Sequence, residues 1–447
     1  MIRFFGHHVP LEMLCLWLLE VGVLSGLIYA LMLADVPPTG VVPWNAWILN
    51  SSVVLAVTIG ATAFAIGLYR PEVFLKTRRL LLNTAMAGIL ALPVVWVVSS
   101  ALGIDVGGLL GYDALWPLKI CVAWIALLFA TRVLFRIAIS RDLLVRRVLV
   151  AGPADAAAGT TAAIRAHRKG FIEVASPKLA QERLDYAALR RAGIKDVVVA
   201  AADDAVPVDG ERSVARKAGV RLHGELEFWE NQLRRINIDR IGPDWRGPAR
   251  STPLQDWVNR LGDVLTSLAF LLVTLPLMLL TALIIRLDSP GPVFYRQERV
   301  GLHGQPFTLF KFRSMRVDAE LKGPTWASQS DPRITRVGSF LRRTRIDELP
   351  QLVNVLRGQM SFIGPRPERP HFVEKLSEVV PHYHDRAWVK PGLTGWAQVN
   401  FPYGASIEDA RVKLSYDLYY VKHRSLLLDA LILIATVRVI LFQEGAR

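Results

Sequence analysis

Cysteine is almost absent from this chain: Cys15 and Cys121 are the only two among 447 residues. Both lie in apolar segments, so the sequence indicates neither a disulfide framework nor a metal site built from thiolates. Motifs for binding DNA or RNA are also missing, although the formal net charge is +14. We therefore expect no nucleic-acid partner, and the excess of cations favours anionic lipid headgroups or nucleotide phosphates.

Hydrophobic residues make up 52% of the chain, which is typical of membrane segments beside soluble parts. Four apolar stretches each contain about the 20 residues that a helix needs to cross a bilayer. They cover residues 11–33, 46–68, 80–102 and 115–138. The sequence therefore predicts a four-helix transmembrane bundle over residues 1–141. The first stretch is long enough to span, so we expect no cleavable signal peptide. Inside it, Glu20 is expected to face neighbouring helices or a wet crevice.

The connections between these stretches predict the orientation. Residues 34–44 and 103–114 contain no lysine or arginine, whereas basic residues cluster between the second and third stretches and after the fourth. Loops rich in lysine and arginine stay in the cytoplasm. The N-terminus and everything after Arg141 are therefore predicted to be cytoplasmic.

After Arg147 the sequence changes to short apolar runs separated by polar stretches. Three runs are typical of strands: residues 147–152, 196–201 and 219–222. An alanine-rich helical stretch up to Lys169 follows the first run, which favours a parallel α/β sheet. We predict a Rossmann-like module over residues 142–250. The turn after its first run lacks the Gly-x-Gly-x-x-Gly pattern of a dinucleotide site, so a structural or regulatory role is expected.

Two adjacent carboxylates, Asp347 and Glu348, lie at the start of an expected helix over residues 348–356. The arginines around them are Arg342, Arg343, Arg345, Arg366 and Arg369. Cations and helix N–H groups can cancel the charge of a phosphoryl group, and a carboxylate among them can hold Mg²⁺ or attack phosphorus. The residues alone also allow a second interpretation, in which Asp347 is an N-cap and the arginines form a solvated basic face.

From about Thr252 onward, the chain resembles the bacterial polyprenol-phosphate phosphoglycosyl transferases, whose catalytic domain is monotopic. The matching runs occur in the family's order and fill most of the C-terminal part. They are residues 288–297, 310–315, 331–338, 345–356, 358–367, 390–400 and 416–421. Larger members of this family resemble the layout of this chain, with a four-helix bundle and a Rossmann-like module before the catalytic domain.

The resemblance implies a role for each residue of the cluster. Asp347 matches the nucleophile that attacks the β-phosphate of a nucleotide diphosphate sugar. Glu348 matches its partner, which positions Mg²⁺ or assists deprotonation of the lipid phosphate acceptor. Arg342 and Arg366 match phosphate clamps, because arginine can bind phosphate oxygens bidentately. The remaining candidates for substrate binding are Asp417, Lys311 and Arg313. The last two would serve equally as charges that face the membrane.

The apolar segment Leu265–Ile285 is nearly long enough to span, but Pro276 lies near its middle, where proline kinks or breaks a helix. Basic residues flank both sides, and a span would place the catalytic part away from cytoplasmic nucleotide sugars. We therefore predict a re-entrant helix over residues 265–287 that breaks at Pro276, as in the family. A fifth span is the alternative. The family usually has a Ser-Pro pair at the break, where this chain has Leu275-Pro276.

The predicted fold class is a four-span membrane bundle, a Rossmann-like α/β module, and a mixed, mainly α monotopic catalytic domain over residues 251–447. The final stretch, residues 425–442, is either an interfacial or a buried helix. The resemblance implies a bacterial inner-membrane enzyme of exopolysaccharide synthesis. It would transfer a phosphosugar from a UDP-sugar to polyprenol phosphate with Mg²⁺ as cofactor and release UMP.

Two other functions remain open at this point. A membrane-bound nucleotide-sugar dehydratase should carry a Tyr-x-x-x-Lys site, which is not found. A non-catalytic assembly or transport protein would tolerate loss of Asp347. The bundle and the module offer surfaces for a homodimer, and none of the motifs identifies the sugar.

Overall fold

A computed structural model of the chain describes residues 2–4, 7–9, 11–34, 45–65, 68–69, 77–103, 116–141, 146–166, 172–175, 184–200, 209–242, 245, 253–317, 319, 331–401 and 406–441. Most of the two connections without lysine or arginine lies outside these residues, as do the predicted domain boundaries at residues 142 and 250–251. Contacts divide the chain into two compact units, Met1–Leu233 and Arg234–Arg447. Each unit is described by itself.

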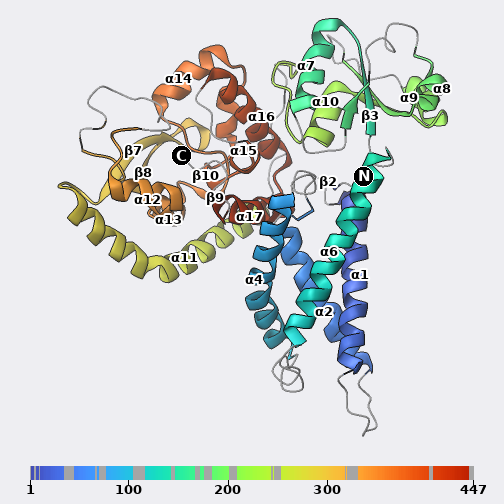
Figure 1. Ribbon diagram of the computed structural model, residues 1–447. Coiled ribbons are helices and arrows are strands. Elements are labelled where there is room, and N and C mark those ends of the chain that lie inside the picture. Colours follow the sequence, from blue (N-terminus) through green and yellow to red (C-terminus); the bar gives the residue numbers. More distant parts are fainter. Residues whose placement is uncertain are drawn as a thin grey trace. The chain divides into compact units, whose positions relative to one another are not determined.

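Four long helices form the bundle of the first unit (Figure 1). They are α1 (Leu11–Ala34), α2 (Asn45–Ala65), α4 (Thr77–Ala101) and α6 (Trp116–Ser140). A short antiparallel pair, β1 (Ile2–Phe4) and β2 (His7–Val9), precedes them. Large apolar side chains such as Ile89, Trp96 and Leu134 are exposed on the bundle, as expected for contact with lipid. The prediction of four apolar helices in this region is confirmed.

Glu20 lies inside the bundle and is paired with a cation. Arg132 of α6 donates a hydrogen bond to Glu20 Oε1, and both side chains are buried. Thr131 Oγ1 donates to the same oxygen at 2.6 Å, and the Tyr69 hydroxyl donates to Glu20 Oε2 at 2.6 Å. The expectation that Glu20 faces its neighbours is confirmed, whereas its partner Arg132 was not predicted. Because a buried charge without its partner is costly, this pair holds α1 against α6.

The rest of the first unit is a four-stranded parallel sheet in the order β4-β3-β5-β6. The strands are β3 (Arg146–Ala151), β4 (Ile172–Val174), β5 (Ile194–Val199) and β6 (Arg221–Gly224). The helices are α7 (Ala154–Ala166), α8 (Tyr186–Arg191), α9 (Asp209–Lys217) and α10 (Glu225–Phe228), followed by a π-helical turn η2 (Trp229–Leu233). The predicted parallel α/β sheet is confirmed, and its classification as Rossmann-like stays a prediction.

The second unit is mainly helical with two small sheets. Its longer helices are α11 (Pro253–Asp288), α12 (Arg336–Thr344), α13 (Gln351–Leu356), α14 (Pro370–Val379), α15 (Trp396–Asn400), α16 (Ile407–His423) and α17 (Leu426–Leu441). Three 3₁₀ turns are η3 (Leu302–Gly304), η4 (Ile346–Glu348) and η5 (Tyr383–Trp388). The strands β7 (Phe294–Val300) and β8 (Pro306–Phe312) pair antiparallel, whereas β9 (Ser361–Ile363) and β10 (Gly392–Thr394) pair parallel.

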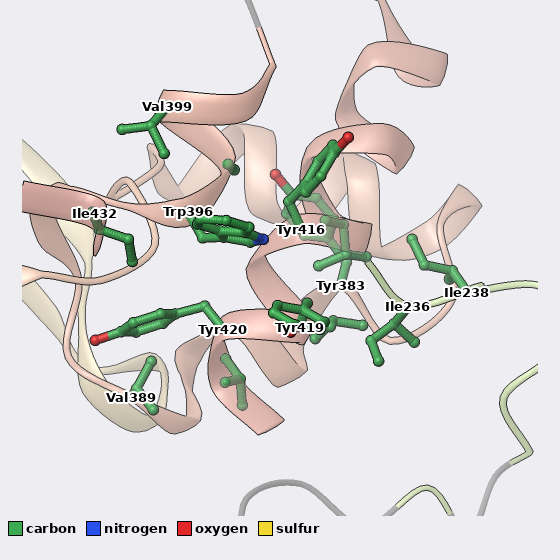
Figure 2. Packing of buried hydrophobic residues seen from close by; sticks show 14 of the residues in the cluster. Ile236, Ile238, Tyr383, Val389, Trp396, Val399, Tyr416, Tyr419, Tyr420 and Ile432 are labelled. Carbon is green, nitrogen blue, oxygen red and sulfur yellow. The ribbon is translucent and has the colours of Figure 1, made fainter. Parts of the chain in front are cut away.

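The core of this unit forms around α16. Figure 2 shows the aromatic side chains at its centre: Tyr416, Tyr419 and Tyr420 of α16, and Trp396 of α15. The Trp396 and Tyr419 rings stack with their centroids 6.0 Å apart. Ile236 and Ile238 are buried in the same cluster (Figure 2). These two residues therefore belong to the second compact unit, Arg234–Arg447.

Helix α11 is continuous through Pro276, so the break predicted at this residue is not present. Figure 1 shows the helix curved along its length. Two local features bend a helix here: the missing N–H of Pro276, and the Thr274 hydroxyl, which donates to the Phe270 carbonyl at 2.6 Å. Proline has therefore changed the direction of this helix without ending it.

One face of α11 is apolar and exposed from end to end. Its side chains recur every three or four residues, which is the spacing of one helix face. They are Leu254, Trp257, Val258, Leu261, Leu265, Leu268, Leu272, Leu275, Leu279, Leu283 and Leu287, which we call the apolar ridge. The opposite face is buried at Asp263, Ser267, Thr281 and Ile285. Near its two ends, the helix thus has one face in the domain, whereas in its middle Phe270, Val273 and Leu277 are exposed beside the apolar ridge.

Both ends of α11 are bound to the same domain. Near its start, Arg260 donates to the carbonyls of Val355 and Leu356, both at 2.6 Å, and Asp263 accepts from the Phe362 N–H at 2.8 Å. Near its end, Ile285 packs in a buried cluster with Phe312 of β8 and Leu341 of α12. The two ends of the helix therefore cannot separate without disrupting the domain.

The final helix, α17, also has two apolar faces. Leu428, Ile432 and Ala435 are buried in the core around α16. On its other face, the side chains of Leu426, Leu433, Val437 and Ile440 are exposed. One face of this helix therefore packs into the core, as the buried alternative predicted. The other face is apolar and exposed, and a location in the membrane interface would cover it.

Candidate active site

The two adjacent carboxylates lie in a sharp turn between α12 and α13. Arg345 begins this turn in the left-handed region, with φ 58° and ψ 15°, which is costly for a residue other than glycine. Asp347 and Glu348 follow in η4, and α13 begins only at Gln351. The Asp347 side chain caps neither helix. The interpretation of Asp347 as a simple N-cap is therefore wrong, and the helix expected from residue 348 begins later.

Helix α12 brings this turn against β8. The Thr335 hydroxyl caps α12 by accepting from the Gly338 N–H at 2.9 Å. A Cβ atom at Gly338 would lie 2.0 Å from the Ser314 carbonyl oxygen, so only glycine permits this close approach. The contact fixes the start of α12 beside the residues that follow β8. As a result, Lys311 of β8 reaches the turn at the other end of α12.

Glu348 is the centre of a cationic cluster. Its Oε1 atom accepts from Arg366 Nη2 at 2.8 Å and from Lys311 Nζ at 3.2 Å, and Arg345 Nη1 lies 3.5 Å away. Burial by itself would raise the pKa of the Glu348 carboxyl, but Arg366, Lys311 and Arg345 hold that pKa well below its ordinary value. Glu348 therefore stays ionised, and it orients cations that come from three separate elements.

Asp347 differs from its neighbour in both bonding and charge. The side chain is only 6% exposed, and its Oδ1 atom has no hydrogen-bond partner among the described residues. Burial raises the pKa of Asp347, with Lys311 opposing the shift and Glu348 adding to it. A buried oxygen without a partner is costly, and a ligand would relieve that cost.

Arg342 and Lys311 lie close enough to Asp347 to influence its pKa. Arg342, in the last turn of α12, also has a buried nitrogen, Nη1, without a hydrogen-bond partner among the described residues. The site thus presents one unpartnered carboxylate oxygen and one unpartnered guanidinium N–H. This combination suits a substrate that carries an electrophilic phosphorus and anionic oxygens.

The parallel pair of β9 and β10 positions Arg366. Gly364 and Gly395 touch directly, because a Cβ atom at Gly395 would lie 2.1 Å from the Gly364 carbonyl oxygen. The Gly364 N–H donates to the Thr394 carbonyl at 2.9 Å. The glycine-rich run before Trp396 therefore shapes the backbone from which the Arg366 guanidinium reaches Glu348.

Arg386 is a site residue that sequence reasoning missed. Its Nη2 atom donates to Asp417 Oδ2 at 2.7 Å and to the Arg366 carbonyl at 3.0 Å, and its Nη1 atom donates to the Tyr383 hydroxyl at 2.9 Å. Burial raises the pKa of Asp417 to about 6, although Arg386 opposes the shift. Asp417 therefore contributes to the site through Arg386. No local pattern marked Arg386, because its partner Asp417 lies on α16, far along the chain.

Arg313 and Pro276 lie apart from this cluster. The Arg313 guanidinium donates to the carbonyls of Ser289 at 2.7 Å and Pro290 at 3.1 Å, just after α11. These bonds direct its two terminal nitrogens to backbone just after α11, and neither nitrogen bonds Glu348. The structure therefore brings together Asp347, Glu348, Arg342, Arg366 and Lys311, adds Asp417 through Arg386, and places Arg313 in the support of α11.

Comparison with known proteins places the same region in one family. Residues 254–443 match the model of the bacterial sugar transferases. The chain is 42% identical over 255 residues to the UDP-N-acetylgalactosamine-undecaprenyl-phosphate N-acetylgalactosaminephosphotransferase of Aeromonas hydrophila, which covers 56% of this chain and 60% of that protein. It is 43% identical over 196 residues to the UDP-glucose:undecaprenyl-phosphate glucose-1-phosphate transferase of Escherichia coli (strain K12), which covers 42% of each.

A shorter relative is matched almost completely. The exopolysaccharide production protein PSS of Rhizobium leguminosarum bv. phaseoli is 43% identical over 189 residues, which cover 40% of this chain and 93% of that protein. By contrast, the chain spans less than two thirds of the length of the Aeromonas and Escherichia relatives. The similarity thus covers nearly the whole length of a short relative and only part of the length of the long ones.

The contacts of Arg386 lead to a prediction about its role. Lysine at this position cannot bond Asp417 and the Arg366 carbonyl together, so Arg386→Lys should lower kcat/KM of the expected transfer about tenfold or more. Asp417→Asn should have a similar effect, and the double variant should be little worse than either, as kinetic assays of all three would show. Arg411→Lys, at a surface pair with Asp239, is the matched control. If the double variant lost as much kcat/KM as the two single variants together, Asp417 would not act through Arg386.

Proposed function

The chain belongs to the bacterial sugar transferase family, and from this premise we propose that it transfers a phosphosugar from a UDP-sugar to a polyprenol phosphate. The products are UMP and a polyprenol diphosphate sugar. The names of the Aeromonas and Escherichia relatives support an undecaprenyl phosphate acceptor. The same names include both N-acetylgalactosamine and glucose, so the proposal leaves the sugar open. The observation that carries it is the buried, unpartnered Oδ1 atom of Asp347 beside the cations around Glu348.

The proposed reaction has two steps at one phosphorus atom. In the first, an Asp347 carboxylate oxygen attacks the β-phosphorus of the UDP-sugar, the bond to the bridging oxygen breaks, and UMP leaves with the bonding electrons. In the second, a phosphate oxygen of the polyprenol phosphate attacks the same phosphorus and releases the Asp347 carboxylate. Arg342, Arg366 and Lys311 supply the positive charge that both steps need.

The low pKa of Glu348 supports one of its two expected roles over the other. A carboxylate whose pKa lies well below its ordinary value is a weak proton acceptor. The same property suits a residue that orients Arg366 and Lys311 by charge. In this proposal, Glu348 therefore holds cations in place, and deprotonation of the acceptor is not assigned to it.

The donor set of the site fits Mg²⁺. Asp347 and Glu348 supply hard carboxylate oxygens, one of which has no partner among the described residues, and Mg²⁺ commonly takes one or two carboxylates together with substrate phosphates. We infer that these two residues would hold the ion. When bound, it would add positive charge beside the diphosphate and favour the ionised form of Asp347.

The contacts of α11 support a helix that does not cross the membrane. By length and composition it could span. However, its two ends bind one domain, through Arg260 and Asp263 near the start and Ile285 near the end. If α11 crossed the membrane, the contacts at its start and those at its end would lie in different compartments. We infer that α11 enters the membrane from one side and presents its apolar ridge to the lipid. The catalytic domain then lies on the cytoplasmic side of a bacterial inner membrane.

This arrangement favours the transferase over the two alternative functions. A dehydratase would place its chemistry in the α/β module, but the paired carboxylates and their cations all lie in the C-terminal unit. A transport or assembly protein has no need of a buried, unpartnered carboxylate beside cations. A homodimer stays a prediction, as does a regulatory role for the α/β module.

Asp347→Asn is expected to abolish turnover while the fold is retained. Asparagine has nearly the same size, and it replaces an oxygen that makes no hydrogen bond with described residues, but it cannot form the acyl phosphate intermediate. UMP release should fall about a thousandfold or more, with an unchanged melting temperature. The matched control is Asp239→Asn, at an exposed surface carboxylate. Full activity of Asp347→Asn would exclude the covalent intermediate.

Metal removal tests the proposed cofactor. If Asp347 and Glu348 meet the diphosphate through Mg²⁺, an excess of chelator should stop UMP release. Added Mg²⁺ should restore it in the same sample, which also controls for loss of protein. Turnover that continues undiminished in chelator would remove Mg²⁺ from the mechanism.

Cysteine labelling tests the position of α11. Single cysteines at Asp256 and Glu298, before and after the helix, should both resist a membrane-impermeant thiol reagent in intact cells when Cys15 and Cys121 are replaced. Both should react once the inner membrane is opened. A cysteine at Asp113, in a connection predicted to be external, is the positive control. Labelling of only one of the two flanking cysteines in intact cells would show that α11 spans.

A further inference from the structure

A large cleft lies beside the first turns of α11. Its volume is about 730 Å³, and it is lined by residues of α11, β9, η3 and the ends of η5 and α16. None of the residues that contact Glu348 lines it. The cleft is therefore a separate feature of the C-terminal unit, which the proposed reaction steps do not use.

Positive charge predominates in this cleft. Its lining contains four basic side chains, Arg260, Lys390, Lys422 and Arg424, and two carboxylates, Asp256 and Asp263. Asp263 is already engaged by the Ser361 hydroxyl and the Phe362 N–H, at 3.0 and 2.8 Å. Asp256 lies 3.6 Å from Arg424. Four basic side chains against two carboxylates leave an excess of positive charge, which suits an anion.

Lys390 is the cation best placed to receive that anion. It forms no hydrogen bond or ion pair with the described residues of the domain, although it is partly buried in the cleft wall. Burial, together with the nearby charge of Arg260, lowers the pKa of Lys390. Arg260 cannot turn away, because its nitrogens are bound to the carbonyls of Val355 and Leu356. A bound anion would relieve this crowding of positive charge.

The cleft lies on the side of α11 opposite the apolar ridge. Asp256, Arg260 and Asp263 line the cleft, whereas Leu254, Trp257 and Leu261 belong to the ridge. A helix with its side chains is about 10 Å across. When the ridge contacts acyl chains, the cleft is therefore at the depth of the lipid headgroups. Trp257, 62% exposed in the first turn, is the residue type that anchors a helix at that depth.

We propose that this cleft binds the phosphate group of a membrane lipid, with Lys390 and Arg424 as its main ligands. The proposal rests on the proposed function, because it takes the membrane location of α11 from it. Two lipids share the required chemistry: the polyprenol phosphate acceptor, which is a phosphate monoester, and an anionic phospholipid, which is a diester. In either case, the lipid phosphate would bind to the same domain that contains the catalytic cluster.

Native mass spectrometry of the full chain in detergent tests the proposal. Farnesyl phosphate serves as the monoester probe and phosphatidylglycerol as the diester probe. We expect Lys390→Gln to weaken binding of at least one probe about five- to tenfold. Lys375→Gln, which changes an exposed lysine on α14, should leave both affinities unchanged. Selective loss of farnesyl phosphate would identify an acceptor site, and loss of phosphatidylglycerol a site for membrane phospholipid.

Equal affinities of the wild type and Lys390→Gln for both lipids would overturn the proposal. If the melting temperature shows that Lys390→Gln does not fold, Arg424→Gln takes its place with the same expectation. UMP release by the same wild-type preparation separates the two ideas. Absence of release would count against the proposed function, whereas normal release with unaltered lipid binding in the variant would count against the cleft alone.

Discussion

The candidate site of the C-terminal unit is organised by one largely buried carboxylate. Glu348 accepts hydrogen bonds from Arg366 and Lys311 and lies near Arg345, and so joins the loop after β9, the strand β8 and the turn after α12. These cations would repel one another without an anion among them, and Glu348 would be costly to bury without cations. The cluster is therefore stable only when all of its members are present, and its assembly places Asp347 in a fixed position beside it.

Two adjacent carboxyl groups have acquired opposite properties from their surroundings. Glu348 is held ionised by hydrogen-bonded cations, whereas burial without hydrogen bonds at Oδ1 raises the pKa of Asp347. Environments that push the pKa values of two neighbouring acids apart commonly divide the work of an active site between them. In the proposed mechanism, this division assigns orientation of cations to Glu348 and reaction with phosphorus to Asp347.

The membrane imposes the second constraint, through α11. Its apolar ridge needs a cover of lipid, while Arg260, Asp263 and Ile285 on its other side bind the domain. Arg313 strengthens this attachment by bonding backbone just after the helix. The helix is thus fixed to the domain at both ends. In the proposed arrangement, this attachment keeps the domain at a constant depth in the bilayer, so that a lipid phosphate and a soluble nucleotide sugar meet at one surface.

The sequence by itself determined the features that depend on neighbours along the chain. Length and apolar composition predict α1, α2, α4 and α6, because a bilayer requires about 20 apolar residues of any spanning helix. Short apolar runs with an intervening helix predict the parallel sheet of β3, β5 and β6. The run around Asp347 and Glu348 predicts the location of the candidate site, since its residue types and their order are local.

Only the tertiary structure decided which distant residues meet. The pairs of Glu20 with Arg132 and of Arg386 with Asp417 join separate helices or turns, so no spacing in the sequence reveals them. Pro276 predicts a broken helix from local chemistry alone, yet contacts at both ends keep α11 continuous through it. The opposite pKa shifts of Asp347 and Glu348 likewise depend on burial and on cations from other elements. These properties arise from packing, which brings together groups that the order of residues keeps apart.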